Sequence, residues 1–574
     1  MLQTLLHIKL AAMVAALGLD TNEWKNPSEA MKADVQKLAD SMSNVGKPGE
    51  SDKVQGAINE TLKDVQRLAE AGDKDALFAL GLFTQQSKEQ GALEKAMEYY
   101  KKAAEKGQLQ AMNNLGFLIA GSSKDPEKQK EGVAMIKKAA DAGNNPARRN
   151  MAQIYLNGLG GEARNPAEAE KLLTMAAKEQ DGDAAFALSQ FYMGQGGKDK
   201  QNDEVGWDWL NKAAGYGNAN ALDLLGTLYF QGGKIGSKEI AKDEKAAVEK
   251  FQKLAEAGNA VGQRKMATLL ESGTVPGVPK DFNKAFEGYK LAAQGNDAFA
   301  QFRLASMYDS GVRKNPKDEK SDFIVAPDAA TALSLYRLAA QNNLPIAAYN
   351  TGVFYEQGRS VDRDYGKAFT YYMAAAQNGV GLAMQKVGDF YLNGANPIMK
   401  DPVAAAAWYA HSAESGVPEG YLSEGFLVEN GVGTKQEDRY YDAASNYMKA
   451  ADSPNASDTV RLLSFMRLGS LYFRGLLTKD AGPDYGNAYI FFEQAVEVDP
   501  KNKAASDARD AALEKVKSKK KELDEKIVTM KKDREKRAAD ARQAAADAAK
   551  PAAAPAAEPA VEPATTGGKK PKKK

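Results

Sequence analysis

The sequence contains no cysteine, only two histidines and no run of eighteen consecutive apolar residues. Without cysteine the chain can form no disulfide, thiol nucleophile, iron–sulfur cluster or thiolate zinc site. With only His7 and His411, a histidine-rich metal site is excluded, and a Ser-His-Asp triad could form only around His411. The lack of a long apolar run argues against a membrane-spanning helix in the mature chain.

Charge is nearly balanced overall but is unevenly distributed along the chain. The 574 residues carry 77 Lys and Arg against 76 Asp and Glu, a formal net charge of +1. Residues 501–574 alone carry 21 basic and 12 acidic residues, a net of +9, which leaves −8 for the preceding 500 residues. The sequence therefore predicts an acidic body with a basic tail.

The N-terminal stretch has features of a signal peptide. Lys9 closes a weakly positive region, Leu10 to Leu17 form a short apolar region, and the segment from Ala16 to Gly18 offers small residues at a cleavage site. Residues 1–18 therefore predict a signal peptide and an exported, periplasmic or extracytoplasmic chain. The alternative is an amphipathic or buried first helix in a cytoplasmic protein. Residues 19–54 are expected to form an N-terminal helical segment.

Most of the chain is an internal repeat. Alanine pairs recur 36 to 47 residues apart, and Leu-Ala, Ser-Ala and Ala-Val replace the pair in three units. They lie at 103–104, 139–140, 176–177, 213–214, 254–255, 292–293, 339–340, 375–376, 412–413, 450–451 and 495–496. A period of this size indicates stacked supersecondary units, so residues 55–500 are predicted to form one solenoid of eleven units with an N-terminal capping helix.

Each unit reads as two helices. The second helix carries the alanine pair and often has an aromatic residue four positions before the second member of that pair. A glycine expected to adopt the left-handed conformation often follows the helix, at 107, 143, 217, 258, 295, 379 and 416. The first helix carries a small residue, often followed three positions later by tyrosine. Because glycine costs roughly 1 kcal/mol within a helix, its recurrence predicts close helix packing, with the neighbouring tyrosine filling the space. The predicted packing residues are Gly116, Gly226, Tyr229, Gly352, Tyr355, Gly388, Tyr391, Gly469 and Tyr472.

This pattern resembles the Sel-one-like repeat family, a subclass of tetratricopeptide-type (TPR-like) repeats. The units Ala219 to Gly258 and Ala347 to Gly379 match its signature well. The resemblance implies an all-α, right-handed superhelical solenoid of about eleven antiparallel helix pairs. It also implies an adaptor that binds other proteins, although a fold does not by itself determine a function.

No catalytic or cofactor-binding constellation is apparent, so we expect a non-enzyme without a metal or cofactor. The glycine-rich stretch Gly232 to Lys238 has the wrong spacing for a phosphate-binding loop. His411 occupies a position of the second helix that is usually polar and exposed.

A long insertion between helices offers a candidate binding loop. The segment Arg313 to Asp328 is charged around a short apolar core of Phe323, Ile324 and Val325. Loops on a rigid solenoid often carry contacts. The alternative is a tolerated insertion without a role.

The C-terminal region predicts a long basic helix followed by a disordered end. Residues 501–549 contain neither glycine nor proline, and apolar residues near heptad positions suggest a weak coiled coil that could mediate self-association. The alternative to a functional tail is a solvated charged helix. Residues 550–574 are rich in Pro, Ala and Lys and are expected to be disordered. The candidate polyanion contacts are Lys519, Lys520, Lys521, Lys531 and Lys532.

These observations favour a non-enzymatic scaffold whose stacked first helices line a groove for a partner peptide or helix. One alternative is a polyanion-binding or envelope-associating protein that acts through its basic tail. A second is a hydrolase for cell-wall-type substrates, an activity assigned to some members of the family. The disulfide-rich pattern of those members is absent here.

Overall fold

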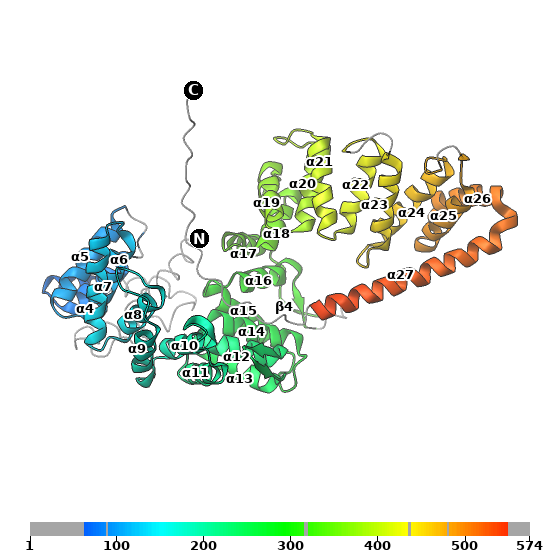
Figure 1. Ribbon diagram of the computed structural model, residues 1–574. Coiled ribbons are helices and arrows are strands. Elements are labelled where there is room, and N and C mark those ends of the chain that lie inside the picture. Colours follow the sequence, from blue (N-terminus) through cyan, green and yellow to red (C-terminus); the bar gives the residue numbers. More distant parts are fainter. Residues whose placement is uncertain are drawn as a thin grey trace, which may run out of the picture. The chain divides into compact units, whose positions relative to one another are not determined.

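The computed structural model describes residues 62–548 apart from 86, 88–89, 315–319, 434–437 and 479–480. The predicted signal peptide at 1–18, the helical segment at 19–54 and the tail at 550–574 lie outside the described residues. Within them, antiparallel helices alternate along the chain, as Figure 1 shows. The expected all-α solenoid of helix pairs is confirmed.

The chain divides into two compact units, one ending at Gly295 and the other beginning at Asn296. In unit 1 the first helices of the pairs are α4 (Lys74–Gln85), α6 (Leu109–Ser122), α8 (Asn145–Asn157), α10 (Gly182–Gln190), α12 (Ala219–Gln231) and α14 (Ala260–Ser272). The second helices are α5 (Ala92–Glu105), α7 (Pro126–Asp141), α9 (Pro166–Lys178), α11 (Asp203–Gly215), α13 (Glu244–Glu256) and α15 (Phe282–Gln294). A π-helical turn, η1 (Phe191–Gln195), extends α10.

Unit 2 repeats the same arrangement. Its first helices are α16 (Ala298–Ser310), α18 (Pro345–Gln357), α20 (Gly381–Asn393), α22 (Pro418–Glu429) and α24 (Asp458–Phe473). Its second helices are α17 (Ala329–Gln341), α19 (Tyr365–Gln377), α21 (Pro402–Glu414), α23 (Arg439–Asp452) and α25 (Tyr485–Val498). In both units each second helix packs against the first helix of its own pair.

A short helix at 62–70 precedes the first pair. Its Val65 and Ala69 are buried against a cluster that includes Leu77, Tyr100 and Ala103. The helix thus covers apolar surface that a preceding repeat would otherwise cover, which is what the end of a repeat array requires.

A recurrent hydrogen-bond pattern joins the two helices of a pair. The residue before the second helix is usually Asp or Asn, and its side chain accepts from a backbone N–H of the first turn, as Asp364 accepts from Lys367 at 2.8 Å. The backbone N–H of the same Asp364 donates to the carbonyl of Tyr355 at 3.0 Å. The tyrosine of the first helix therefore anchors the cap of the second helix through its main chain.

Glycine ends most second helices in the left-handed conformation, with φ of 81° at Gly107 and 86° at Gly379. The prediction is wrong at Gly295, where φ is −74°. There the left-handed position falls one residue later, at Asn296 with φ of 66°. Asparagine tolerates this conformation because its short polar side chain can bond locally.

Two insertions form small antiparallel hairpins between the helices of a pair. In unit 1, β1 (Gly233–Ile235) pairs with β2 (Lys238–Ile240). In unit 2, β3 (Val312–Arg313) pairs with β4 (Phe323–Val325). Both insertions thus leave the helix pairing of their repeats unchanged.

The basic region after the repeats forms two helices rather than the single one expected over 501–549. The first, α26 (Lys503–Val516), packs against α25 as the first helix of another repeat would. A 3₁₀ turn, η3 (Lys517–Lys519), leads into α27 (Lys520–Ala548). Figure 1 shows α27, in red, turning back from the end of α26, and its first half contacts α25.

Candidate protein-binding grooves

The five predicted packing glycines all lie where another helix comes close. A Cβ atom added to Gly352 would lie 2.7 Å from the ring of Tyr372. The added Cβ at Gly388, Gly226 or Gly469 would similarly meet Tyr409, Phe251 or Phe492, whereas at Gly116 it would meet the backbone oxygen of Gly132 at 2.5 Å. The ring beside the glycine therefore comes from the second helix, four residues before the second member of the alanine pair.

The predicted first-helix tyrosines occupy a different place, against aromatic rings of second helices. Tyr355 stacks on Tyr371 with ring centroids 5.8 Å apart. The other contacts pair Tyr229 with Trp207, Tyr391 with Phe369 and Tyr472 with Phe491. These tyrosines lie in the packing between helices rather than on a free surface.

Buried tyrosines of the second helices make a repeated polar contact. The hydroxyl of Tyr372 donates to Glu356 at 2.6 Å, and that of Tyr447 donates to Glu429 at 2.7 Å. Tyr100 donates to Gln85 at 2.6 Å. Burial is the main cause that raises the pKa of Tyr100 and of Tyr336 to about 12, so these hydroxyls remain protonated donors.

The candidate binding loop folds back on its own repeat. Phe323 is 37% exposed, and the guanidinium of Arg313 lies 4.1 Å from the centre of its ring. Ile324 is half-buried, and Val325 is buried opposite Val312 in the hairpin. Of the three candidate residues, Phe323 therefore offers the most surface to a partner.

The candidate polyanion-binding lysines fall into two groups. Lys520 pairs with Asp524 at 2.6 Å, and Lys531 pairs with Glu497 of α25 at 2.5 Å. Lys519, Lys521 and Lys532 are exposed. The pair of Lys520 lies within α27, whereas that of Lys531 holds α27 against α25.

The heptad-like apolar residues of α27 also have a partner within the chain. Leu523 and Ile527 are 4% and 3% exposed and pack in a cluster with Tyr489 and Phe492 of α25. The hydroxyl of Tyr489 donates to Asp524 at 2.8 Å. This apolar stripe, which suggested self-association, therefore covers the end of the repeat array.

The first helices α4, α6 and α8 form a polar hollow of about 350 Å³ in unit 1, which we call the first-helix hollow. Its walls include Asn113, Asn114, Phe117 and Asn150. The amide of Asn150 donates to Asn113 at 2.9 Å, and the ring of Phe117 is 59% exposed. Side-chain amides beside an exposed aromatic ring suit a peptide, which offers both main-chain polar groups and apolar side chains.

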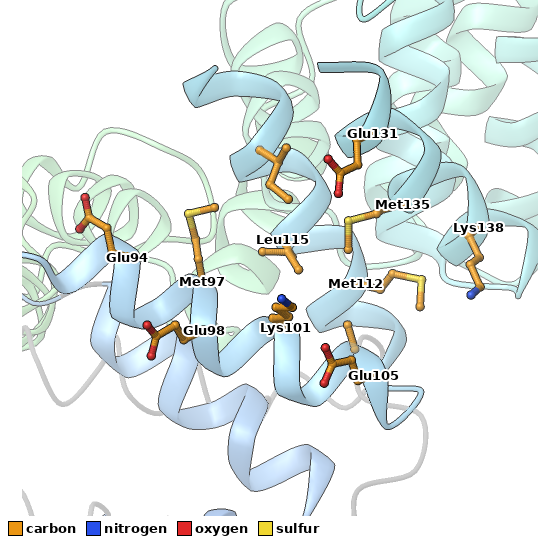
Figure 2. Close-up of a pocket in the computed structure, with 12 residues that line it drawn as sticks. Glu94, Met97, Glu98, Lys101, Glu105, Met112, Leu115, Glu131, Met135 and Lys138 are labelled. Atoms are coloured by element: carbon orange, nitrogen blue, oxygen red, sulfur yellow. The ribbon is translucent and has the colours of Figure 1, made fainter. Parts of the chain in front are cut away.

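On its other side, α6 contributes to a second hollow of about 570 Å³, which we call the methionine groove. It lies between the second helices α5 and α7, with Met97, Met112, Leu115 and Met135 among its apolar lining. Figure 2 shows Met97 and Met135 on either side of Leu115. The charged side chains that line it are Glu94, Glu98, Lys101, Glu105, Glu131 and Lys138.

Sequence reasoning did not single out the residues of either hollow. The available signal was apolar or aromatic residues at positions that the repeat does not bury, such as Met97, Met135 and Phe117. Which of these face an open space depends on the neighbouring repeat, and the pattern of one unit does not contain that information.

His411 lies on the surface, with its side chain 60% exposed and 3.4 Å from Glu414. Over the part of the chain that the structure describes, no group of three or more His, Asp or Glu residues is placed to hold a metal ion. In the same part, no helix has both the length and the apolarity needed to cross a membrane.

Comparison with known proteins identifies the repeat. The family model described as "Sel1 repeat" matches residues 74–108, 109–144, 145–181, 182–215, 219–259, 260–297, 298–318, 319–344, 345–380, 381–417 and 466–498. The matches to 298–318 and 319–344 meet between α16 and α17, where the insertion with the β3–β4 hairpin lies.

Solved structures with the same fold include a protective antigen of uropathogenic Escherichia coli with an SLR fold. It is 23% identical over 88% of this chain and 99% of its own, with a TM-score of 0.56. A Sel1 repeat protein from Oxalobacter formigenes is 25% identical over 62% of this chain and 87% of its own, with a TM-score of 0.35. Proteins built from such repeats generally mediate protein–protein interactions and are generally non-catalytic. Since the matched segments cover more than half of its length, the chain belongs to the Sel1 repeat family.

Proposed function

We propose that this protein is a non-catalytic scaffold that binds a partner peptide or helix on the first-helix face of its repeats. The observation that carries the proposal is the first-helix hollow, where Phe117 is 59% exposed beside the amides of Asn113 and Asn150. Aromatic residues, phenylalanine included, are enriched in protein interfaces relative to the rest of the surface.

The test is affinity capture from a native extract with two forms of the full chain, wild type and Phe117→Ser. We expect the wild type to retain a discrete protein, and Phe117→Ser to retain at least about tenfold less of it, because an interface aromatic often contributes more than 1.4 kcal/mol. Leu159→Ser is the matched control, since Leu159 is also exposed, at 51%, but does not line the hollow. Equal retention by all three forms would contradict the proposal.

The alternative function, binding of a polyanion by the basic tail, is favoured by the exposure of Lys519, Lys521 and Lys532. A third bait with these three lysines changed to glutamate separates the two functions. A ligand of the first-helix hollow is retained by this bait, whereas a polyanion is lost from it. Polyanion binding also falls steeply as salt rises, because it depends on release of counterions.

A further inference from the structure

The methionine groove of unit 1 has a counterpart at the end of unit 2, between α23, α24 and α25. Equivalent residues of the two sites are identified by their positions relative to the alanine pairs and to the first-helix glycine. Glu105 and Asp452 each follow an alanine pair directly, Met112 and Phe465 each precede the glycine by four residues, and Lys138 and Gln494 each directly precede the pair of the next second helix.

In unit 2 this counterpart is occupied, and its occupant is α27. Arg534 donates through Nε to Asp452 at 2.8 Å and through a terminal nitrogen to Gln494 at 2.8 Å. Its guanidinium also lies 4.8 Å from the centre of the Phe465 ring. Met530, one turn earlier on α27, packs against the apolar cluster that contains Phe465. An arginine and an apolar residue of one basic helix thus contact three counterparts of the groove's lining residues.

The methionine groove in unit 1 offers the same chemistry. Met97 and Met135 are half-buried, and methionine adapts to apolar side chains of varied shape. Glu105 is exposed at the position that Asp452 occupies in unit 2. Four glutamates and two lysines line the groove, so its charge complements a cation.

We propose that the methionine groove binds a cationic amphipathic helix from a partner protein. This inference rests on the proposed scaffold function and specifies a second binding surface and its partner class. The partner directs an arginine to Glu105 and an apolar side chain between Met97 and Met135, as α27 directs Arg534 and Met530 in unit 2.

A peptide of residues 518–540 serves as the probe, because its sequence makes these contacts in unit 2. It is kept helical by a staple at the exposed positions Glu525 and Thr529 and carries a fluorescent label. Titration with the full chain, followed by fluorescence anisotropy, is expected to show saturable binding. Glu105→Arg in the chain should weaken binding at least about tenfold, since it turns an attractive charge pair into a repulsive one.

The reciprocal exchange makes the test specific. A probe with Arg534→Glu should bind the Glu105→Arg chain more tightly than the wild-type chain. Asp199→Arg is the control for net charge, because Asp199 is exposed and does not line the groove. Absence of binding, or binding that Glu105→Arg leaves unchanged, would overturn the inference. If the partner captured through Phe117 persists in that case, the scaffold function stands and only the methionine groove is misassigned.

Discussion

At the scale of single residues, the repeat depends on a glycine of the first helix that lies against an aromatic ring of the second. We expect Gly352→Ala to destabilise the protein by about 1–2 kcal/mol, because the added Cβ would lie 2.7 Å from the fully buried Tyr372 ring. This combines an overpacking cost of roughly 1–3 kcal/mol with a helix-propensity gain of up to about 1 kcal/mol. Urea unfolding followed by circular dichroism measures the difference.

Gly215→Ala is the control, because nothing lies within 4 Å of the added Cβ at that helical position. It should leave stability unchanged or raise it by up to about 1 kcal/mol. Equal destabilisation by the two variants would mean that the contact with Tyr372 is not what selects glycine at position 352.

A second prediction at this scale concerns the buried tyrosine hydroxyls. Tyr372→Phe should lower stability by about 1–2 kcal/mol, since Glu356 loses a hydrogen bond of 2.6 Å while remaining half-buried. Burial and the neighbouring Glu356 raise the pKa of Tyr372. The loss of stability should therefore be constant from pH 6 to 9, where the hydroxyl is protonated in both the folded and the unfolded wild-type protein. Tyr371→Phe, on the adjacent residue that stacks on Tyr355, should cost less in the same unfolding experiment.

At the scale of helices, α27 is held against α23 and α25 by apolar contacts and ion pairs. We expect Leu523→Asp combined with Ile527→Asp to release it, because both side chains are almost fully buried against α25. Trypsin should then cleave α27 much faster than in the wild type, because the basic residues of α27 are protected only while the helix is docked against α25. Mass spectrometry of the fragments would locate the cleavage.

Val528→Asp provides the control for this experiment, since Val528 adjoins Ile527 in the sequence but is 51% exposed. It should leave the cleavage rate near that of the wild type. Equal protection of α27 in the double variant would show that the apolar contacts with α25 do not hold it.

The helices of the repeats could be predicted from the sequence because the units share one recurring pattern of residues. The small-residue pair and the glycines recur at similar positions in most units, so the helices can be assigned even where one unit departs from the pattern. The docking of α27 could not be predicted in this way. The same spacing of Leu523, Ile527 and Met530 suits a second copy of the chain or α25, and only the position of α25 decides between them.

At the scale of the whole molecule, the proposed binding surfaces are built by several repeats together. The helix α6 contributes Phe117 to the first-helix hollow and Met112 to the methionine groove, so two partners could bind on its two sides. Neither hollow belongs to one repeat, and for that reason neither could be located from the repeat pattern. The insertion with Phe323 and the exposed Lys519, Lys521 and Lys532 remain predicted contacts.

The measurement that tests the central claim most directly is photo-crosslinking in the native cell, with benzoylphenylalanine in place of Phe117. The scaffold account predicts a discrete crosslinked protein from this position and none from the same group in place of Leu159, which is similarly exposed outside the hollow. Identical products from the two positions, or no protein adduct from position 117, would contradict the account.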